Sequence, residues 1–149
     1  MELRGDIAVY SFWSRGTTAI FDVRVTDTDS KSYLATDPSK ILSRMEKEKK
    51  DKYSDVCSEN HLHFTPLVYS VDGLEGTKAK AARKRLASRL AAKWNRQYSQ
   101  ICGFVRSRLA FTLVRSTSRC LRGSRAPCQR VGSLEWLSGS GARLYNQLF

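Results

Sequence analysis

The apolar and polar positions of the first 26 residues predict a β-hairpin. The stretches DIAVYSFW (6–13) and TTAIFDVRVT (17–26) are rich in β-branched and aromatic residues, and the turn-forming sequence SRGT joins them. Successive side chains of a strand point to opposite faces, so the second strand has two different sides. One is apolar and is expected to face the core: Ala19, Phe21, Val23 and Val25. The other carries polar groups in mid-strand: Ile20, Asp22, Arg24 and Thr26.

A helix and a third strand are predicted next. Asp37 is suited to cap a helix and Pro38 to its first position. The helix should continue through ILSRMEKEKKDKYSDVC, with Ile41 and Met45 on its buried side. The apolar stretch HFTPLVYSVDG (63–73) then predicts a strand that ends in a glycine turn. The strand–helix–strand order favours a right-handed crossover, so the third strand should lie parallel to the second.

Two basic helices are predicted after Thr77. Their buried sides are expected to hold Ala79, Ala82, Leu86, Leu90 and Trp94 in the first helix, and Cys102, Val105, Leu109 and Leu113 in the second. Separate faces carry basic stripes, made of Arg85, Arg89, Lys93 and Arg96 on the first helix and Arg108, Arg115, Arg119 and Arg122 on the second. Such stripes without acidic partners favour binding to a phosphate backbone, which carries no sequence specificity by itself.

The expected fold class is α/β: a small mixed β-sheet, made of a hairpin plus a parallel third strand, with a crossover helix and two C-terminal basic helices. We divide the chain into a core at residues 1–76, a basic helical hairpin packed on it at 77–123, and a poorly ordered tail at 124–149.

Charge is distributed unevenly along the 149 residues. Up to Glu75 there are ten Lys and Arg against thirteen Asp and Glu, a net charge of −3. From Gly76 onward there are sixteen Lys and Arg against the single acid Glu135, a net charge of +15. This asymmetry predicts a polyanionic partner, DNA or RNA first and an anionic membrane surface second.

The cysteines and the hydropathy pattern set the expected compartment. The four cysteines form no CxxC pair, so free thiols in a reducing compartment are expected and a structural zinc site is not. No signal peptide and no run of about eighteen apolar residues is found. We therefore expect an intracellular protein that is not secreted.

Two carboxylates in the predicted hairpin suggest chemistry. Asp6 and Asp22 lie on neighbouring antiparallel strands, and a tight hairpin would place them side by side. Like charges at that distance repel, so the pKa of one should rise unless a cation joins them. Mg²⁺ meets this need because it binds through one or two carboxylates, waters and phosphate oxygens. In the simpler interpretation Asp6 begins a strand and Asp22 forms a salt bridge with Arg24 or Arg4.

Several motifs in order strengthen the first interpretation. The sequences RGDI, FDVRVTD, EKEKKDKY and FTPLVYSVDGLEG resemble the restriction-like endonuclease domain of non-LTR retrotransposon reverse-transcriptase polyproteins, within the PD-(D/E)xK superfamily. The resemblance covers Arg4 to about Gly76. Gly5 stands in place of the usual proline and Arg24 in place of the usual lysine. The helix and strand that precede the first motif in the family are not found ahead of it here, so we expect an incomplete core in which catalysis is lost more easily than binding.

The resemblance implies a metal-dependent endonuclease that nicks DNA in the nucleus with Mg²⁺ or Mn²⁺. It implies these site residues: Asp6 and Asp22 as metal ligands, the main-chain carbonyl of Val23 as a third ligand, Arg24 in the lysine position, and Lys49 or Lys52 as the source of the missing positive charge.

Other interpretations remain open. The chain could be a DNA- or RNA-binding module without chemistry, or a protein of the membrane surface. Phe12 and Trp13 could stack on a base, although hairpin aromatics are more often core. His61 and His63 are more often structural than catalytic. The charged helix is expected to be a solvated face held by pairs four residues apart, Glu46–Lys50 and Glu48–Lys52.

Overall fold

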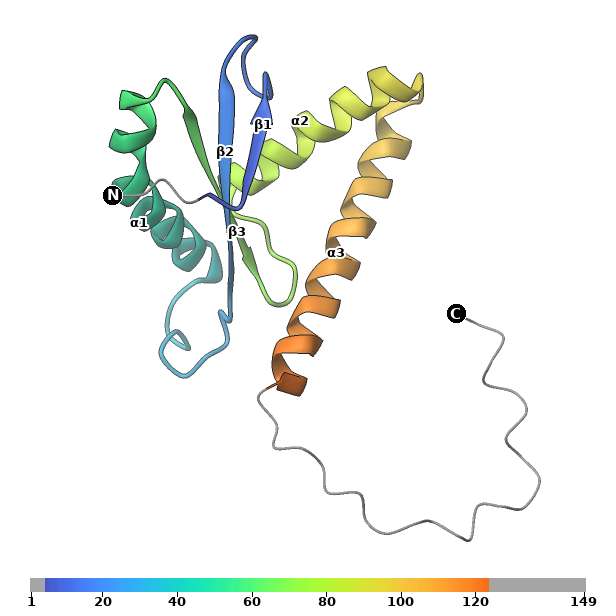
Figure 1. Ribbon diagram of the computed structural model, residues 1–149. Helices are drawn as coiled ribbons and strands as arrows, with labels where there is room; N and C mark the ends of the chain where they lie inside the picture. The colour runs from blue at the N-terminus through green and yellow to red at the C-terminus, as the bar shows by residue number, and fades with distance from the viewer. Residues whose placement is uncertain (1–4, 124–149) are drawn as a thin grey trace, which may run out of the picture.

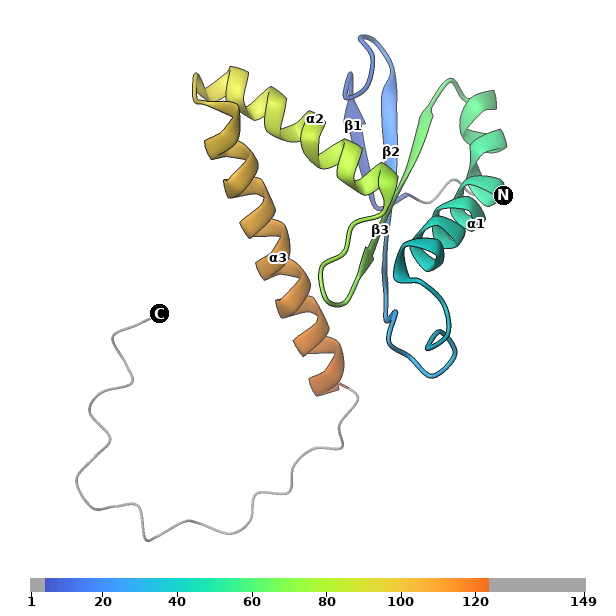
Figure 2. The same cartoon turned by 180° about the vertical axis from the view of Figure 1, so that it is seen from behind.

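The computed structural model describes residues 5–123. Its elements are β1 (Ile7–Tyr10), β2 (Thr18–Thr26), α1 (Pro38–Glu59), β3 (His63–Ser70), α2 (Thr77–Trp94) and α3 (Tyr98–Gly123). The sheet order is β1–β2–β3, with β1 antiparallel and β3 parallel to the central strand β2. Helix α1 covers one face of the sheet and α2 the other, and α3 turns back from the end of α2 (Figures 1 and 2). The predicted α/β fold is confirmed, while the tail predicted at 124–149 lies outside the described residues.

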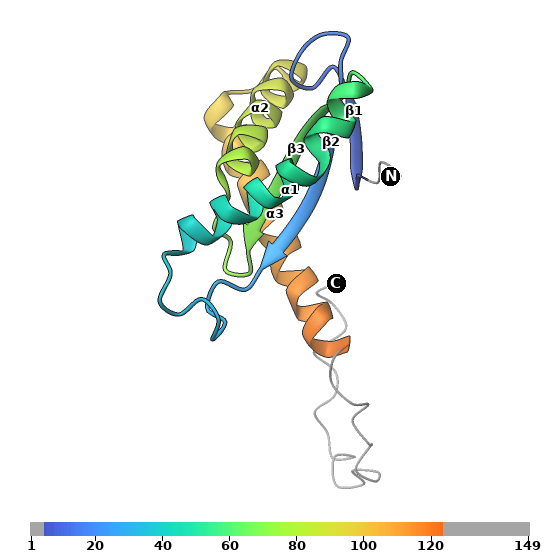
Figure 3. The ribbon, with the colours of Figure 1, turned by 90° about the vertical axis from the view of Figure 1, so that its left-hand side faces the viewer.

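Three apolar clusters hold these layers together. On the α2 face, the core contains Phe12, Ala19, Phe21 and Ala82. On the α1 face, it contains Ile41, Leu42, Met45 and Val68. Between α2 and α3 lie Ala87, Ala91, Ile101 and Val105. Figure 3 shows α1 crossing in front of the sheet, and its side chains reach β2 through the contacts of Lys49 with Asp22 and of Glu48 with Arg24.

The two faces of β2 differ from the prediction. Val23 and Val25 were expected in the core but are 39% and 42% exposed, whereas Asp22 on the opposite face is only 8% exposed. The reason is the placement of the helices. Helix α2 covers the apolar face of β2 around Ala19 and Phe21, and α3 packs against α2. Val23 and Val25 lie further along the same face and stay exposed, while α1 lies over the polar face.

The buried side of α2 is also shifted. Leu86 and Trp94 were predicted to be buried but are 38% and 45% exposed. The inward side of α2 is made of small side chains, which allow close contact with the sheet and with α3. They are Ala79, Ala82, Ala87 and Ala91. The indole of Trp94 packs edge-on against Phe104 of α3.

Strand β1 is shorter than predicted and ends at Tyr10. Ser11 has a φ of 56°, in the left-handed region, which interrupts the strand. The chain then folds inward, so that Phe12 joins the core and the indole N–H of Trp13 donates to Oγ1 of Thr65 on β3 at 2.8 Å. The hairpin therefore reaches across β2 to the third strand.

The starts of α1 and α2 are capped differently. Asp37 accepts the amide of Ser39 at 2.7 Å and Pro38 follows it, as predicted. Helix α2 begins after Gly76, and its Lys78 amide donates at 2.7 Å to Oε1 of Glu46, a buried residue of α1. A Cβ at Gly76 would overlap this carboxylate, so only glycine leaves room for the cap. The predicted Glu46–Lys50 pair is replaced by this contact.

Candidate functional site

The centre of the site is an ion pair between the sheet and the crossover helix. The ammonium group of Lys49 on α1 contacts Oδ2 of Asp22 on β2, and the two side chains are 23% and 11% exposed. This oxygen is buried, and among residues 5–123 it accepts no well-aligned hydrogen bond. The negative charge of this oxygen is therefore balanced by the ammonium group, although no hydrogen-bond donor points directly at it. Such an oxygen requires a cation.

Asp6 lies directly before β1 and bonds to the part of β2 on either side of Asp22. The antiparallel pairing of β1 with β2 ends at Ile7, opposite Phe21, and Asp6 comes directly before it. The Asp6 amide donates to the carbonyl of Phe21 at 2.9 Å, and its Oδ2 accepts the amide of Val23 at 2.7 Å. Unlike Asp22, Asp6 is exposed. The hairpin thus supplies one buried and one exposed carboxylate.

The other predicted basic residues have different partners. Arg24, in the lysine position of the motif, donates to Oε2 of Glu48 on α1 at 3.1 Å. Lys52 lies over the ring of Tyr53, with its ammonium nitrogen 5.0 Å from the ring centroid. Lys49 is therefore the basic residue that the structure brings to Asp22, and the predicted Glu48–Lys52 pair is replaced by the contact with Arg24.

The two carboxylates suit a hard divalent ion in ligand type and number. Mg²⁺ and Mn²⁺ prefer oxygen ligands, and Mg²⁺ commonly uses only one or two carboxylates. Oδ2 of Asp22 is a buried acceptor whose positive partner in the structure is Lys49. Within the described part of the chain no cluster of three His, Cys, Asp or Glu residues forms a metal site. The remaining ligand positions would belong to main-chain carbonyls, such as that of Val23, to water and to phosphate oxygens.

The predicted basic stripe of α2 is partly engaged with the hairpin. Arg85 donates to the carbonyls of Phe12 and Trp13 at 3.3 and 3.4 Å. Arg89 donates to the carbonyl of Ser11 and lies over the ring of Phe12, 5.8 Å from its centroid. These arginines therefore fix the β1–β2 loop while keeping exposed positive charge. Lys93 and Arg96 are exposed near the end of the helix.

The stripe of α3 has no such role. Its members are all exposed: Arg108, Arg115, Arg119 and Arg122. Within residues 5–123 none of them forms an ion pair, since the four salt bridges of this part of the chain involve other residues. This face of α3 therefore has the charge and the accessibility that phosphate binding needs.

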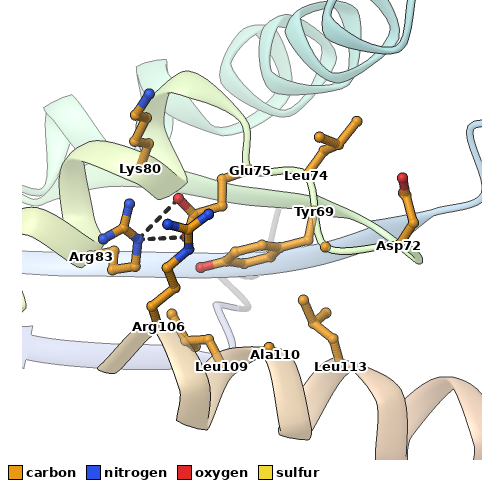
Figure 4. A pocket seen from close by; sticks show the side chains of 11 residues that line it. Tyr69, Asp72, Leu74, Glu75, Lys80, Arg83, Arg106, Leu109, Ala110 and Leu113 are labelled. Atoms are coloured by element: carbon orange, nitrogen blue, oxygen red, sulfur yellow. Dashed lines mark hydrogen bonds and ion pairs between the residues drawn. The ribbon is translucent and has the colours of Figure 1, made fainter. Parts of the chain in front are cut away.

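A cavity of about 510 Å³ lies between α3 and the turn after β3. Arg83 of α2, 8% exposed, forms two hydrogen bonds with the carboxylate of Glu75 at 2.7 and 3.0 Å at its wall (Figure 4). Burial, together with the charge of Glu75, raises the pKa of the neighbouring Tyr69 to about 12. No sequence pattern indicated this cluster, because its members come from β3, the following turn, α2 and α3.

Comparisons with protein-family models, with curated proteins and with solved structures each give no significant match. The family resemblance therefore stays a prediction from the motifs. No helix among residues 5–123 is both long and apolar enough to cross a membrane.

Proposed function

We propose that this chain is a metal-dependent endonuclease-like domain that nicks DNA, of the kind found in retrotransposon reverse-transcriptase polyproteins and acting in the nucleus. The observation that supports it most is the ion pair between Lys49 and buried Asp22, with Asp6 bound to the amide of the next residue of β2, Val23. Two acids and a lysine are the groups that a PD-(D/E)xK site uses. Here the lysine comes from the helix, since Arg24 is bound to Glu48.

Each residue of the site has its own role in this proposal. Asp6 and Asp22 would hold the divalent ion, which when bound lowers the pKa of a coordinated water and stabilises the leaving oxygen. Lys49 would orient the attacking water and offset the negative charge that develops on the phosphate. Attack of the water oxygen at phosphorus breaks one ester bond and leaves a nick. The exposed arginines of α3 would hold the phosphate backbone.

A plasmid assay tests this proposal. Purified wild-type chain is incubated with supercoiled plasmid and Mg²⁺ or Mn²⁺, beside Asp22→Asn and the control Asp51→Asn, which removes an exposed carboxylate of α1. The expected result is nicking by wild type and the control, stopped by a chelator and reduced at least 100-fold in Asp22→Asn. Intact plasmid with wild type, or equal nicking by Asp22→Asn, contradicts the proposal.

One observation favours a second candidate, a DNA- or RNA-binding module without chemistry. Lys49 already supplies the cation that Asp22 needs, so the pair is complete as a structural contact. The arginines of α3 are exposed in either case. Plasmid that is shifted by the protein but stays intact with both metals would support this candidate.

A further inference from the structure

We propose that a cavity at the free edge of β3 binds one nucleotide through both its phosphate and its base. The cavity has a volume of about 360 Å³ and includes Trp13, Lys50, Ser54, His63, Phe64 and Lys78 in its lining. This volume lies within the range of small-ligand sites. The inference deepens the proposed function, on which it rests, by naming a second place where the chain meets nucleic acid.

The cavity follows from the position of β3 as an edge strand. β3 pairs with β2 on one side, and on the other its C-terminal half bonds to residues 74–76, so no strand pairs with the far edge of its first half, at His63–Thr65. Alternate residues of β3 face opposite layers, which places Phe64 toward α1 and His63 toward α2. Helix α1 brings Lys50 and Ser54, four residues apart on one side of the helix, and α2 brings Lys78.

The charge of the lining selects an anion. Lys50 and Lys78 are cationic and Ser54 adds a hydroxyl donor, while no carboxylate belongs to the lining. The nearby acid Glu46 is turned toward the start of α2, where it accepts the Lys78 amide. The larger cavity beside α3 differs, because Asp72 and Glu75 belong to its lining. A phosphate group therefore fits the edge cavity better.

The aromatic wall is held in place before any ligand arrives. The Trp13 indole donates to Oγ1 of Thr65, and its ring lies 5.9 Å from the ring of His63. An indole N–H can only donate, so this hydroxyl accepts from Trp13, and it also forms a hydrogen bond of 3.2 Å with Nδ1 of His63. A fixed indole beside phosphate-binding donors suits a nucleotide, whose flat base stacks on aromatic rings.

Trp13 fluorescence tests the inference directly. The Trp94→Phe/Trp136→Phe chain leaves Trp13 as its single tryptophan. It is titrated with adenosine monophosphate, adenosine, inorganic phosphate, and tetrathymidylate with and without a 5′-phosphate. Saturable quenching is expected with adenosine monophosphate or with phosphorylated tetrathymidylate, and weaker binding with adenosine and inorganic phosphate. Quenching by both nucleotide probes identifies a free-nucleotide site, and quenching by the phosphorylated tetramer alone identifies a strand end.

A charge-matched pair of variants separates a site from general attraction. Lys50→Gln/Lys78→Gln removes the two cavity lysines, while Lys47→Gln/Lys84→Gln removes two exposed lysines of the same helices outside the cavity. The first pair should weaken binding at least tenfold and the second should leave it unchanged. Absent quenching by both nucleotide probes, equal weakening in both pairs, or inorganic phosphate binding as tightly as adenosine monophosphate would overturn the inference.

The two proposals fail separately. If the chain nicks plasmid but nucleotides do not quench Trp13, the proposed function stands and the nucleotide site in the edge cavity is wrong. If nucleotides quench Trp13 but the chain does not nick plasmid, the nucleotide site stands and the catalytic proposal is wrong.

Discussion

Lys49 of α1 and Asp22 of β2 form an ion pair that joins the crossover helix to the central strand beneath it. Asp22 is the one acid of the two-carboxylate pair that is buried, and its side chain depends on Lys49 for charge balance. A partly buried ion pair adds little net stability over an apolar contact, but breaking it by removing one partner leaves a desolvated charge behind. The same two side chains therefore serve the fold and the candidate chemistry.

Lys49→Met should lower the free energy of unfolding by about 2 kcal/mol, because it strands the Asp22 carboxylate. The Asp22→Asn/Lys49→Met double variant should be destabilised less, since no buried charge remains. Arg24→Met, which breaks the more exposed pair with Glu48, should cost less than about 1 kcal/mol. Urea unfolding measures all three. Equal costs for Lys49→Met and Arg24→Met would refute the structural role of the pair.

Glu46→Ala should destabilise the chain by about 1–2 kcal/mol, because the Lys78 amide at the start of α2 loses its acceptor and the helix dipole loses a negative partner. Glu48→Ala is the matched control, with the same charge change on an exposed side chain of the same helix. Thermal and urea unfolding of the two variants give the comparison. The cap has no importance if both variants unfold alike.

Ionisation of Tyr69 should lower the stability of the folded chain at alkaline pH. Its pKa is raised to about 12 in the folded chain, first by burial and then by the charge of Glu75. The folded state keeps a proton that the unfolded state releases near pH 10, so this stability is present below about pH 10 and lost as pH rises toward 12. The free energy of unfolding of wild type should therefore fall relative to that of Tyr69→Phe, which cannot ionise, by at most about 2–3 kcal/mol. Urea unfolding between pH 8 and 11, with Tyr10→Phe as the exposed control, checks this, and a constant difference between wild type and Tyr69→Phe would argue against it.

The arginines of α3 and α2 should behave differently. Replacing Arg108 and Arg115 by Gln should weaken duplex DNA binding and lower the salt slope of its affinity by roughly 0.9 for each phosphate that is no longer neutralised, without changing stability. Replacing Arg85 and Arg89 should instead lower the unfolding temperature, because the hairpin carbonyls then have no guanidinium donor from α2. Filter binding at several salt concentrations and calorimetry separate the two effects, and an unchanged salt slope in the α3 variant would count against a backbone-binding face.

Local sequence signals predicted most of the fold. The turn in the hairpin, the Asp37–Pro38 start of α1 and the strand–helix–strand order act over short distances, and the structure has them. The exposed side of β2 at Val23 and Val25 depends on how far α2 and α3 reach over the sheet, which no local pattern records.

The candidate site, too, could be predicted from the sequence only in part. The hairpin made it predictable that Asp6 would contact the middle of β2, where it bonds to Phe21 and Val23, and the helix was one expected source of a basic partner. The sequence could not choose between Lys49 and Lys52, since this depends on the angle at which α1 crosses β2. The contact of Trp13 with Thr65 joins residues 52 positions apart and had no sequence signal at all.

Mn²⁺ binding followed by electron paramagnetic resonance tests the divalent-ion site directly, with wild type, Asp6→Asn/Asp22→Asn and Asp51→Asn. One bound ion per chain is expected for wild type and for Asp51→Asn, with binding at least tenfold weaker in the double variant. Equal Mn²⁺ binding by all three chains, or no binding by wild type, would contradict a divalent-ion site on the two hairpin carboxylates.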